Sequence, residues 1–233
     1  MANQLWFDFS PADNGFSEKN FCYGNSNALA KQALLRWQSW SLGVLILVGP
    51  LGCGKSHLSE IWRSNNNGRI LSSVSIPLRD TGNFVIEDVD GQLDEEGLFH
   101  LLNRAMNDQA RVLLTARTGP SNWRINLGDL RSRINAIEMV RIGEPDEQVL
   151  SEMLKKLGKD RSLRLSDKLI QYMVERMERS SQSALQLIEN LNASSLAASR
   201  PVNRALAKQV LSDMEKTPEL LGLMRSGDDQ GRS

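Results

Sequence analysis

The residues with the clearest chemistry form the octapeptide Gly49-Pro50-Leu51-Gly52-Cys53-Gly54-Lys55-Ser56, which matches the phosphate-binding pattern G-x-x-x-x-G-K-[ST]. It directly follows the apolar run 44–48, which is typical of a buried strand. Glycines let successive backbone N–H groups turn inward at the start of the next helix, where the helix dipole also favours an anion. We therefore expect Lys55 to reach the β- and γ-phosphates of a nucleotide and Ser56 to bind Mg²⁺. The alternative is a tight glycine turn without a ligand.

Two acidic residues, Glu87 and Asp88, follow a second apolar run, Phe84-Val85-Ile86. A phosphate loop needs an acid at the end of a neighbouring strand to hold the Mg²⁺ shell and polarise water. Glutamate stands here where aspartate is more usual, and its extra methylene displaces the carboxylate by about an ångström or more. Alternatively, both acids cap the following turn.

Two arginines, Arg131 and Arg133, lie just before the last expected strand. A planar, permanently charged guanidinium at this place can reach out of its own site into that of the next subunit. There it would stabilise the transition state at a γ-phosphate. The alternative is a solvated or salt-bridged arginine, and spacing alone does not decide between the two.

Composition limits the possible functions. With 28 Lys and Arg against 28 Asp and Glu, the chain has no bulk positive field that would attract DNA or a membrane. Of only two cysteines, Cys22 and Cys53, the second lies inside the phosphate loop, where a disulfide would obstruct the site. We therefore expect a reducing, cytoplasmic setting. The chain shows no apolar stretch long enough for a membrane span and no basic start typical of an export signal.

The alternation of strands and helices predicts a parallel, doubly wound α/β sheet with its ligand at the carboxyl ends of the strands. We expect strands at 44–48, 69–74, 83–89, 111–116 and 137–142, and helices at 25–39, 55–64 and 93–107. Beyond residue 143 only helical periodicity remains, at 146–157, 166–178, 181–198 and 202–215. The predicted organisation is a flexible amino-terminal peptide (1–15), an α/β domain (16–143), an all-helical lid domain (144–216) and an unstructured tail (217–233).

Four motifs, taken in order, resemble the DnaA-like AAA+ family of P-loop NTPases. They are Gly24-Asn25-Ser26-Asn27-Ala28-Leu29-Ala30, Gly54-Lys55-Ser56-His57-Leu58, Val85-Ile86-Glu87-Asp88 and Leu130-Arg131-Ser132-Arg133-Ile134. The resemblance covers about residues 16–215 and stops where the replication initiator DnaA would continue into a DNA-binding domain. A stand-alone module of this kind is similar to the Hda group, the regulatory inactivators of DnaA. The resemblance implies a five-stranded parallel sheet followed by a helical lid.

The resemblance also implies site residues around bound ADP or ATP and Mg²⁺. It places Cys22, Tyr23 and Asn27 near the base, and His57 in continuation of the loop. Catalytic roles would fall to Glu87 and Asp88, the metal would lie at Ser56 and Glu87, and Arg133 would act in trans as an arginine finger.

Departures from the family pattern argue against vigorous self-hydrolysis. Ala116 stands near the position of a polar sensor, and Gln182 replaces a lid arginine, with Arg179 about one turn away. Only about residues 77–82 separate the second and third strands, where DnaA carries helices that grip single-stranded DNA. We therefore expect nucleotide binding but no strong direct binding of DNA.

The amino terminus, Gln4-Leu5-Trp6-Phe7-Asp8-Phe9, is similar to peptides that dock on the DNA polymerase sliding clamp, and the Hda group carries such a peptide. Leu5 and an aromatic residue would fill a hydrophobic pocket while Gln4 sets the register. Alternatively, Trp6 and Phe9 pack onto the protein's own core.

Three functions are consistent with these features. The first is a regulator that is tethered to the clamp and promotes ATP hydrolysis by DnaA through Arg133. The second is a stand-alone AAA+ ATPase that loads or remodels another replication protein. The third is an adaptor in which ADP only stabilises the fold. The sequence leaves open whether ADP or ATP is the functional ligand and whether the chain forms a homodimer.

Overall fold

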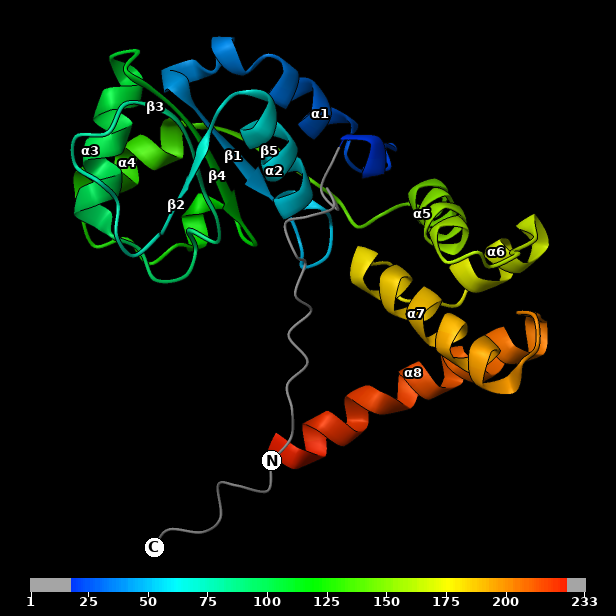
Figure 1. The fold of residues 1–233 in the computed structure, drawn as a ribbon. Coiled ribbons are helices and arrows are strands. Elements are labelled where there is room, and N and C mark those ends of the chain that lie inside the picture. The colour runs from blue at the N-terminus through cyan, green and yellow to red at the C-terminus, as the bar shows by residue number, and fades with distance from the viewer. Residues whose placement is uncertain (1–17, 226–233) are drawn as a thin grey trace, which may run out of the picture. The chain divides into compact units, whose positions relative to one another are not determined.

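The computed structural model describes residues 18–225, and within them the chain divides into two compact units between Gly143 and Glu144. The first unit contains a five-stranded, fully parallel sheet with the strand order β2-β3-β4-β1-β5 (Figure 1). The strands are β1 (Val44–Val48), β2 (Arg69–Leu71), β3 (Gly82–Ile86), β4 (Ala110–Ala116) and β5 (Glu138–Arg141). The predicted α/β class is confirmed. The amino-terminal peptide lies outside the described residues.

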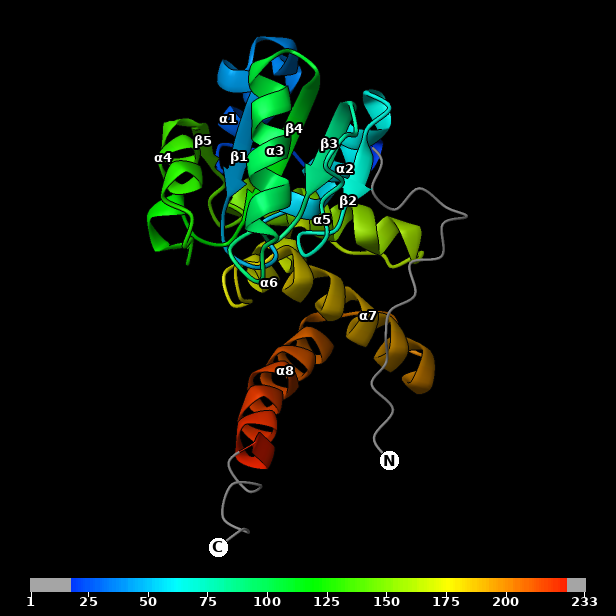
Figure 2. The same ribbon diagram turned by 90° about the vertical axis from the view of Figure 1, so that its left-hand side faces the viewer.

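Helices cover both faces of the sheet (Figures 1 and 2). Leu45 and Leu47 of β1 pack in one core with α1 (Ala28–Leu35) and α2 (Lys55–Asn65). Ile46 of the same strand packs in a second core with α3 (Glu95–Met106) and α4 (Gly128–Ala136). Because both faces are covered, every residue of β1 is buried, which explains a continuous apolar run instead of an alternating one.

Some element predictions for the first unit are wrong in extent. The helix expected at 25–39 is shorter, because α1 ends at Leu35 and only a 3₁₀ turn, Trp37–Ser39, follows. The strand expected at 69–74 ends at Leu71. Helix α4 was not predicted, because its buried residues are only Leu130 and Ile134 and no side chain caps its start. One i,i+4 pair is too short a pattern to indicate a helix.

The second unit is all-helical, with α5 (Glu147–Asp160), α6 (Asp167–Val174), α7 (Ser181–Ala198) and α8 (Arg204–Arg225). The side chain of Ser166 accepts a hydrogen bond from the Leu169 N–H, and that of Asn203 from the Leu206 N–H. Helix α8 extends beyond residue 215, so the prediction of an unstructured tail is corrected for residues 217–225. Good helix formers such as Leu and Glu in this stretch favour the extension.

Candidate nucleotide-binding site

The phosphate loop connects the end of β1 to the start of α2. Gly52 and Gly54 have φ angles of 73° and 98°, a region in which glycine is favoured. Gly49 is required for space, since a Cβ there would lie 2.5 Å from the carbonyl oxygen of Ile142 and 2.7 Å from Cys53 Sγ. The loop therefore delivers its backbone N–H groups to the N-terminus of α2, a favourable place for an anion.

The Lys55 side chain is folded into the loop and is 7% exposed. Its ammonium group donates hydrogen bonds to the carbonyl oxygens of Gly49 at 2.7 Å and Pro50 at 2.9 Å. A phosphate would offer stronger, charge-assisted hydrogen bonds than these carbonyls do. The nearby Cys53 is buried, and burial raises the pKa of its thiol in spite of Lys55. Cys53 therefore adds no negative charge to the phosphate loop.

The two acids after β3 have different surroundings. Glu87 is partly buried, and its Oε1 accepts a 2.7 Å hydrogen bond from Ser59 Oγ on α2. Asp88 is exposed with φ 52°, and its backbone N–H donates to Thr115 Oγ1 at 3.3 Å. Thr115, the residue before Ala116, thus has a buried hydroxyl that fastens the acidic turn to β4. The contact with Ser59 had not been predicted, because 28 residues separate it from Glu87.

The residues expected near the base lie on the segment that leads into α1. Asn27 is 3% exposed; its amide donates to the Cys22 carbonyl at 3.0 Å and accepts from the Gly24 N–H at 3.1 Å. The Lys31 ammonium lies over the Tyr23 ring, with its nitrogen 3.7 Å from the ring centroid. Burial, and to a smaller extent the nearby Glu18, raises the pKa of Tyr23.

Phe21 links this segment to the phosphate loop, a role that was not anticipated. Its ring centroid lies 4.8 Å from that of Tyr23 and 5.0 Å from that of His57 on α2. A Cβ on Gly54 would lie 3.0 Å from the Phe21 ring. The structure thus brings Tyr23 and His57 to the same end of α2.

The residue types fit Mg²⁺ carried by a nucleotide. Mg²⁺ prefers oxygen ligands and is usually held by one or two carboxylates together with phosphates. The Ser56 hydroxyl lies in the first turn of α2, where it is exposed, and the Glu87 carboxylate lies beside the same helix. These two side chains would hold the metal, which would neutralise phosphate charge.

The two candidate finger residues lie on α4. The Arg133 guanidinium donates to Asn103 Oδ1, lies 3.3 Å from Met106 Sδ and is centred 4.6 Å from the Phe99 ring centroid. Phe99, Asn103 and Met106 are spaced to form one stripe of α3. Arg131 is exposed and donates to the Ile125 carbonyl.

The start of α4 is anchored to α3 by one carboxylate. Glu95 accepts hydrogen bonds from the backbone N–H groups of Asn126, at 2.9 Å, and Leu127, at 2.7 Å. These bonds hold the pKa of Glu95 below its ordinary value. The helix that carries both arginines therefore has a defined position on the first unit.

Comparison with known proteins identifies the family. Residues 146–211 match the family model described as "Hda, lid domain". The chain is an Hda-like, DnaA-related AAA+ protein. Domain III of the Thermotoga maritima replication initiation protein DnaA superposes with a TM-score of 0.72 at 17% identity, covering 88% of this chain and 98% of that chain. The family resemblance predicted from the four motifs is thereby confirmed.

A further solved structure shares the fold, and a further relative is similar in sequence. A structure of the Thermotoga maritima RuvB Holliday junction branch migration motor has a TM-score of 0.64 at 18% identity, over 84% of this chain and 71% of that chain. An uncharacterized protein from Haemophilus influenzae is 24% identical over 232 residues, covering 91% of this chain and 100% of the relative.

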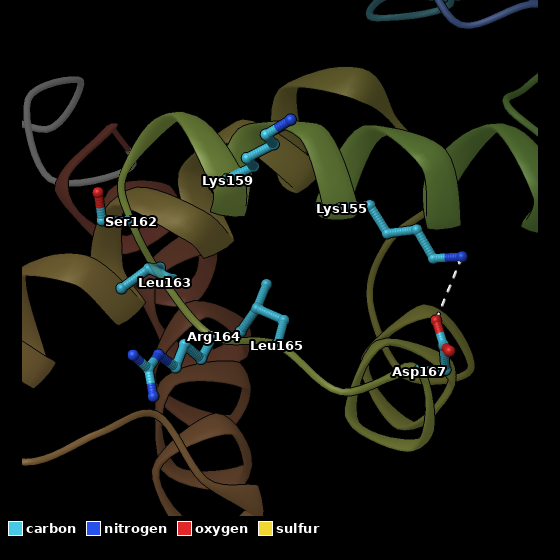
Figure 3. Close-up of a pocket in the computed structure, with 7 residues that line it drawn as sticks. All are labelled: Lys155, Lys159, Ser162, Leu163, Arg164, Leu165 and Asp167. Atoms are coloured by element: carbon cyan, nitrogen blue, oxygen red, sulfur yellow. Dashed lines mark ion pairs between the residues drawn. The ribbon is translucent and has the colours of Figure 1, made fainter.

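The Hda-like lid shows its own polar features. Gln182 is the second residue of α7, and Arg179 pairs with Glu147 at 2.9 Å. A hollow of about 520 Å³ opens between α5 and the connection to α6, with Lys159 and Arg164 on its lining and Lys155 paired with Asp167 (Figure 3). No residue of the phosphate loop lines this hollow.

None of the helices within residues 18–225 is long and apolar enough to cross a membrane.

Proposed function

We propose that this protein restrains the initiation of DNA replication by acting on DnaA. The observation that carries the proposal is the Hda lid-domain match over residues 146–211 on a chain whose sheet has the DnaA-type AAA+ fold. A DnaA structure from Aquifex aeolicus with the same fold, at a TM-score of 0.64 and 19% identity, is described as AMPPCP-bound.

The phosphate loop would hold ADP or ATP. In the bound state Lys55 exchanges the carbonyl oxygens of Gly49 and Pro50 for phosphate oxygens, to which its charge binds more strongly. The segment from Cys22 to Asn27 lies beside the base. The enclosed lysine and the loop N–H groups favour holding a nucleotide, which stabilises the conformation presented to a partner.

The chemistry would take place in the site of the partner. Arg133 reaches the γ-phosphate of DnaA-bound ATP, where a guanidinium stabilises the charge of the transition state. To do so it leaves Asn103 and the Phe99 ring, and both contacts are weaker than a charge-assisted bond to phosphate. A tether to the sliding clamp through Gln4 to Phe9 would raise the local concentration of the two proteins.

Turnover of DnaA-bound ATP, measured with the clamp loaded on DNA, tests the finger. Arg133→Ala should abolish the stimulation, and Arg131→Ala, on the same helix, is the matched control that should retain it. The opposite result would assign the finger to Arg131, and no stimulation by the unaltered protein would refute the function. Substantial ATP turnover by the purified chain alone would favour the loader or remodeller.

A pull-down on immobilised clamp tests the tether. The intact chain should be retained, and a chain that lacks residues 1–9 should not. A full-length variant with Gln4→Ala and Leu5→Ala separates loss of the peptide contact from an effect of truncation. Equal retention of all three proteins would exclude this peptide as the tether.

A further inference from the structure

The connection between β4 and α4 carries two exposed arginines, Arg117 and Arg124, at the two ends of the turn 118–123. Within residues 18–225, neither guanidinium takes part in a hydrogen bond or an ion pair. By contrast, Arg111 near the start of β4 pairs with Asp108 at 2.9 Å. The turn therefore presents positive charge that the described part of the chain does not neutralise.

The end of β5 adds a third arginine to the same turn. A Cβ on Gly119 would lie 3.3 Å from Arg141 Nη2 and 3.5 Å from Met139 Sδ, so both side chains lie against the turn. Arg141 is exposed, and it too has no ion pair in the described part of the chain. Arg117, Arg124 and Arg141 thus border one turn, and we call these three residues the arginine surface.

The backbone of the turn is held in one conformation. The Asp90 carboxylate accepts hydrogen bonds from the N–H groups of Arg117, at 2.9 Å, and Thr118, at 3.0 Å. The indole N–H of the buried Trp123 donates to the Thr118 carbonyl at 2.8 Å. Because the backbone is ordered before any partner binds, less entropy is lost on binding.

The turn leads directly into the helix that carries the candidate finger. Glu95 accepts hydrogen bonds from the backbone N–H groups of residues 126 and 127, and the Arg131 side chain donates to the Ile125 carbonyl. The chain from the turn to α4, on which Arg133 lies, is therefore fastened along its length. A partner bound to the arginine surface would contact a segment that also positions the finger.

Composition favours a protein as the partner. Residues 56–154 contain ten arginines and no lysine. Protein interfaces are enriched in arginine and methionine and depleted in lysine, and Met139 beside the turn is 37% exposed. Asp90 and the exposed Asp129 place negative charge in the same region, which is unfavourable for a nucleic-acid backbone. Guanidinium groups pair in a bidentate way with carboxylates, so the matching protein surface would be acidic.

We propose that the arginine surface docks on an acidic surface of the partner protein, next to the nucleotide site that Arg133 enters. The inference rests on the function proposed above, because it takes ATP-bound DnaA as that partner. Recognition of the partner and stimulation of its hydrolysis would then depend on different residues of one connected segment. Complementary charge of this kind mainly accelerates association.

The test is association of the full chain with ATP-loaded DnaA, followed by biolayer interferometry at low and at physiological salt. In the double variant Arg117→Glu, Arg124→Glu, the association rate constant should fall about tenfold or more, because like charges then face each other. Added salt should slow the unaltered protein more than the variant. The concentration that gives half-maximal stimulation of DnaA should rise in parallel.

Further variants separate this role from an effect on folding or on bulk charge. Arg117→Gln, Arg124→Gln removes the charge without reversing it and should give an intermediate rate constant. Arg164→Glu, Arg200→Glu is the matched control, because it makes the same change in net charge at two exposed arginines of the second unit. It should associate like the unaltered protein.

The outcomes distinguish the two proposals. Equal association of the unaltered protein and both arginine-surface variants, or an equal loss in the control, overturns the inference and leaves the proposed function standing. Binding that is weakened by the variants but brings no stimulation even in the unaltered protein refutes the proposed function alone. No binding of the unaltered protein to DnaA overturns both. Loss of binding to a short labelled DNA duplex, with DnaA association unchanged, would assign the surface to nucleic acid and overturn the inference.

Discussion

The two positively charged sites of the first unit are built in opposite ways. At the phosphate loop, Lys55 is enclosed, with its charge satisfied by carbonyl oxygens of its own loop. On α4, Arg131 is exposed, and Arg133 rests on one stripe of α3 with part of its surface open to solvent. A group that holds a ligand within its own chain gains from enclosure, because a low dielectric strengthens its contacts. A group that acts on another molecule must be accessible and weakly held.

The largest expected effect tests how tightly each site is packed. Gly49→Ala places a Cβ against the backbone of Ile142, so we expect the free energy of unfolding to fall by about 3 kcal/mol, the upper end of typical overpacking costs. Nucleotide binding should be lost as well. Urea denaturation and mant-ADP titration measure the two effects.

Gly128→Ala, at the start of α4, is the control for the exposed site. No heavy atom lies within 4 Å of the added Cβ, and the position is helical. Stability should stay the same or rise by less than about 1 kcal/mol, because alanine is the better helix former. Equal losses in both variants would contradict the contrast between an enclosed and an open site.

The second effect concerns Arg133 as a structural element. Arg133→Ala removes a hydrogen bond to Asn103 and a contact with the Phe99 ring, so the free energy of unfolding should fall by about 1 kcal/mol. The same variant should lose the proposed stimulation of ATP hydrolysis by DnaA, although most of its own folding stability remains. A destabilisation above about 3 kcal/mol in urea denaturation would mean that Arg133 serves mainly to hold α4 on α3.

The smallest effect is a pH dependence at the start of α4. The backbone N–H groups of Asn126 and Leu127 hold the pKa of Glu95 below that of the unfolded chain, about 4.3. The ionised carboxylate therefore stabilises the fold above that pH, and the contribution is lost as pH falls through the lower, folded-state pKa.

Glu95→Gln keeps an acceptor oxygen and removes the charge. At pH 7 the variant should be less stable by about 0.3–1 kcal/mol, as is typical for an exposed carboxylate near a helix N-terminus. The difference should be smaller at pH 3, because the carboxylate takes up a proton as the pH falls through its lowered, folded-state pKa. Denaturation curves at both pH values measure it, and a difference of unchanged size at low pH would rule out the charge as its cause.

The sequence predicted the first unit best where the pattern is local. The run 44–48 and the glycines of the loop imply their conformation by themselves, since a doubly covered strand must be apolar and positive φ favours glycine. Helix α4 could not be predicted, because one buried i,i+4 pair without a cap is too weak a signal.

The sequence by itself determined the parallel sheet, the phosphate loop and the candidate residues around it, because these depend on periodicity and on glycines at fixed spacing. Only the tertiary structure decided which side chains meet. Ser59 contacts Glu87, and Arg133 contacts Asn103, across 28 and 30 residues respectively. Such pairs arise from the order of the strands and the packing of helices on them, so no local sequence pattern predicts them.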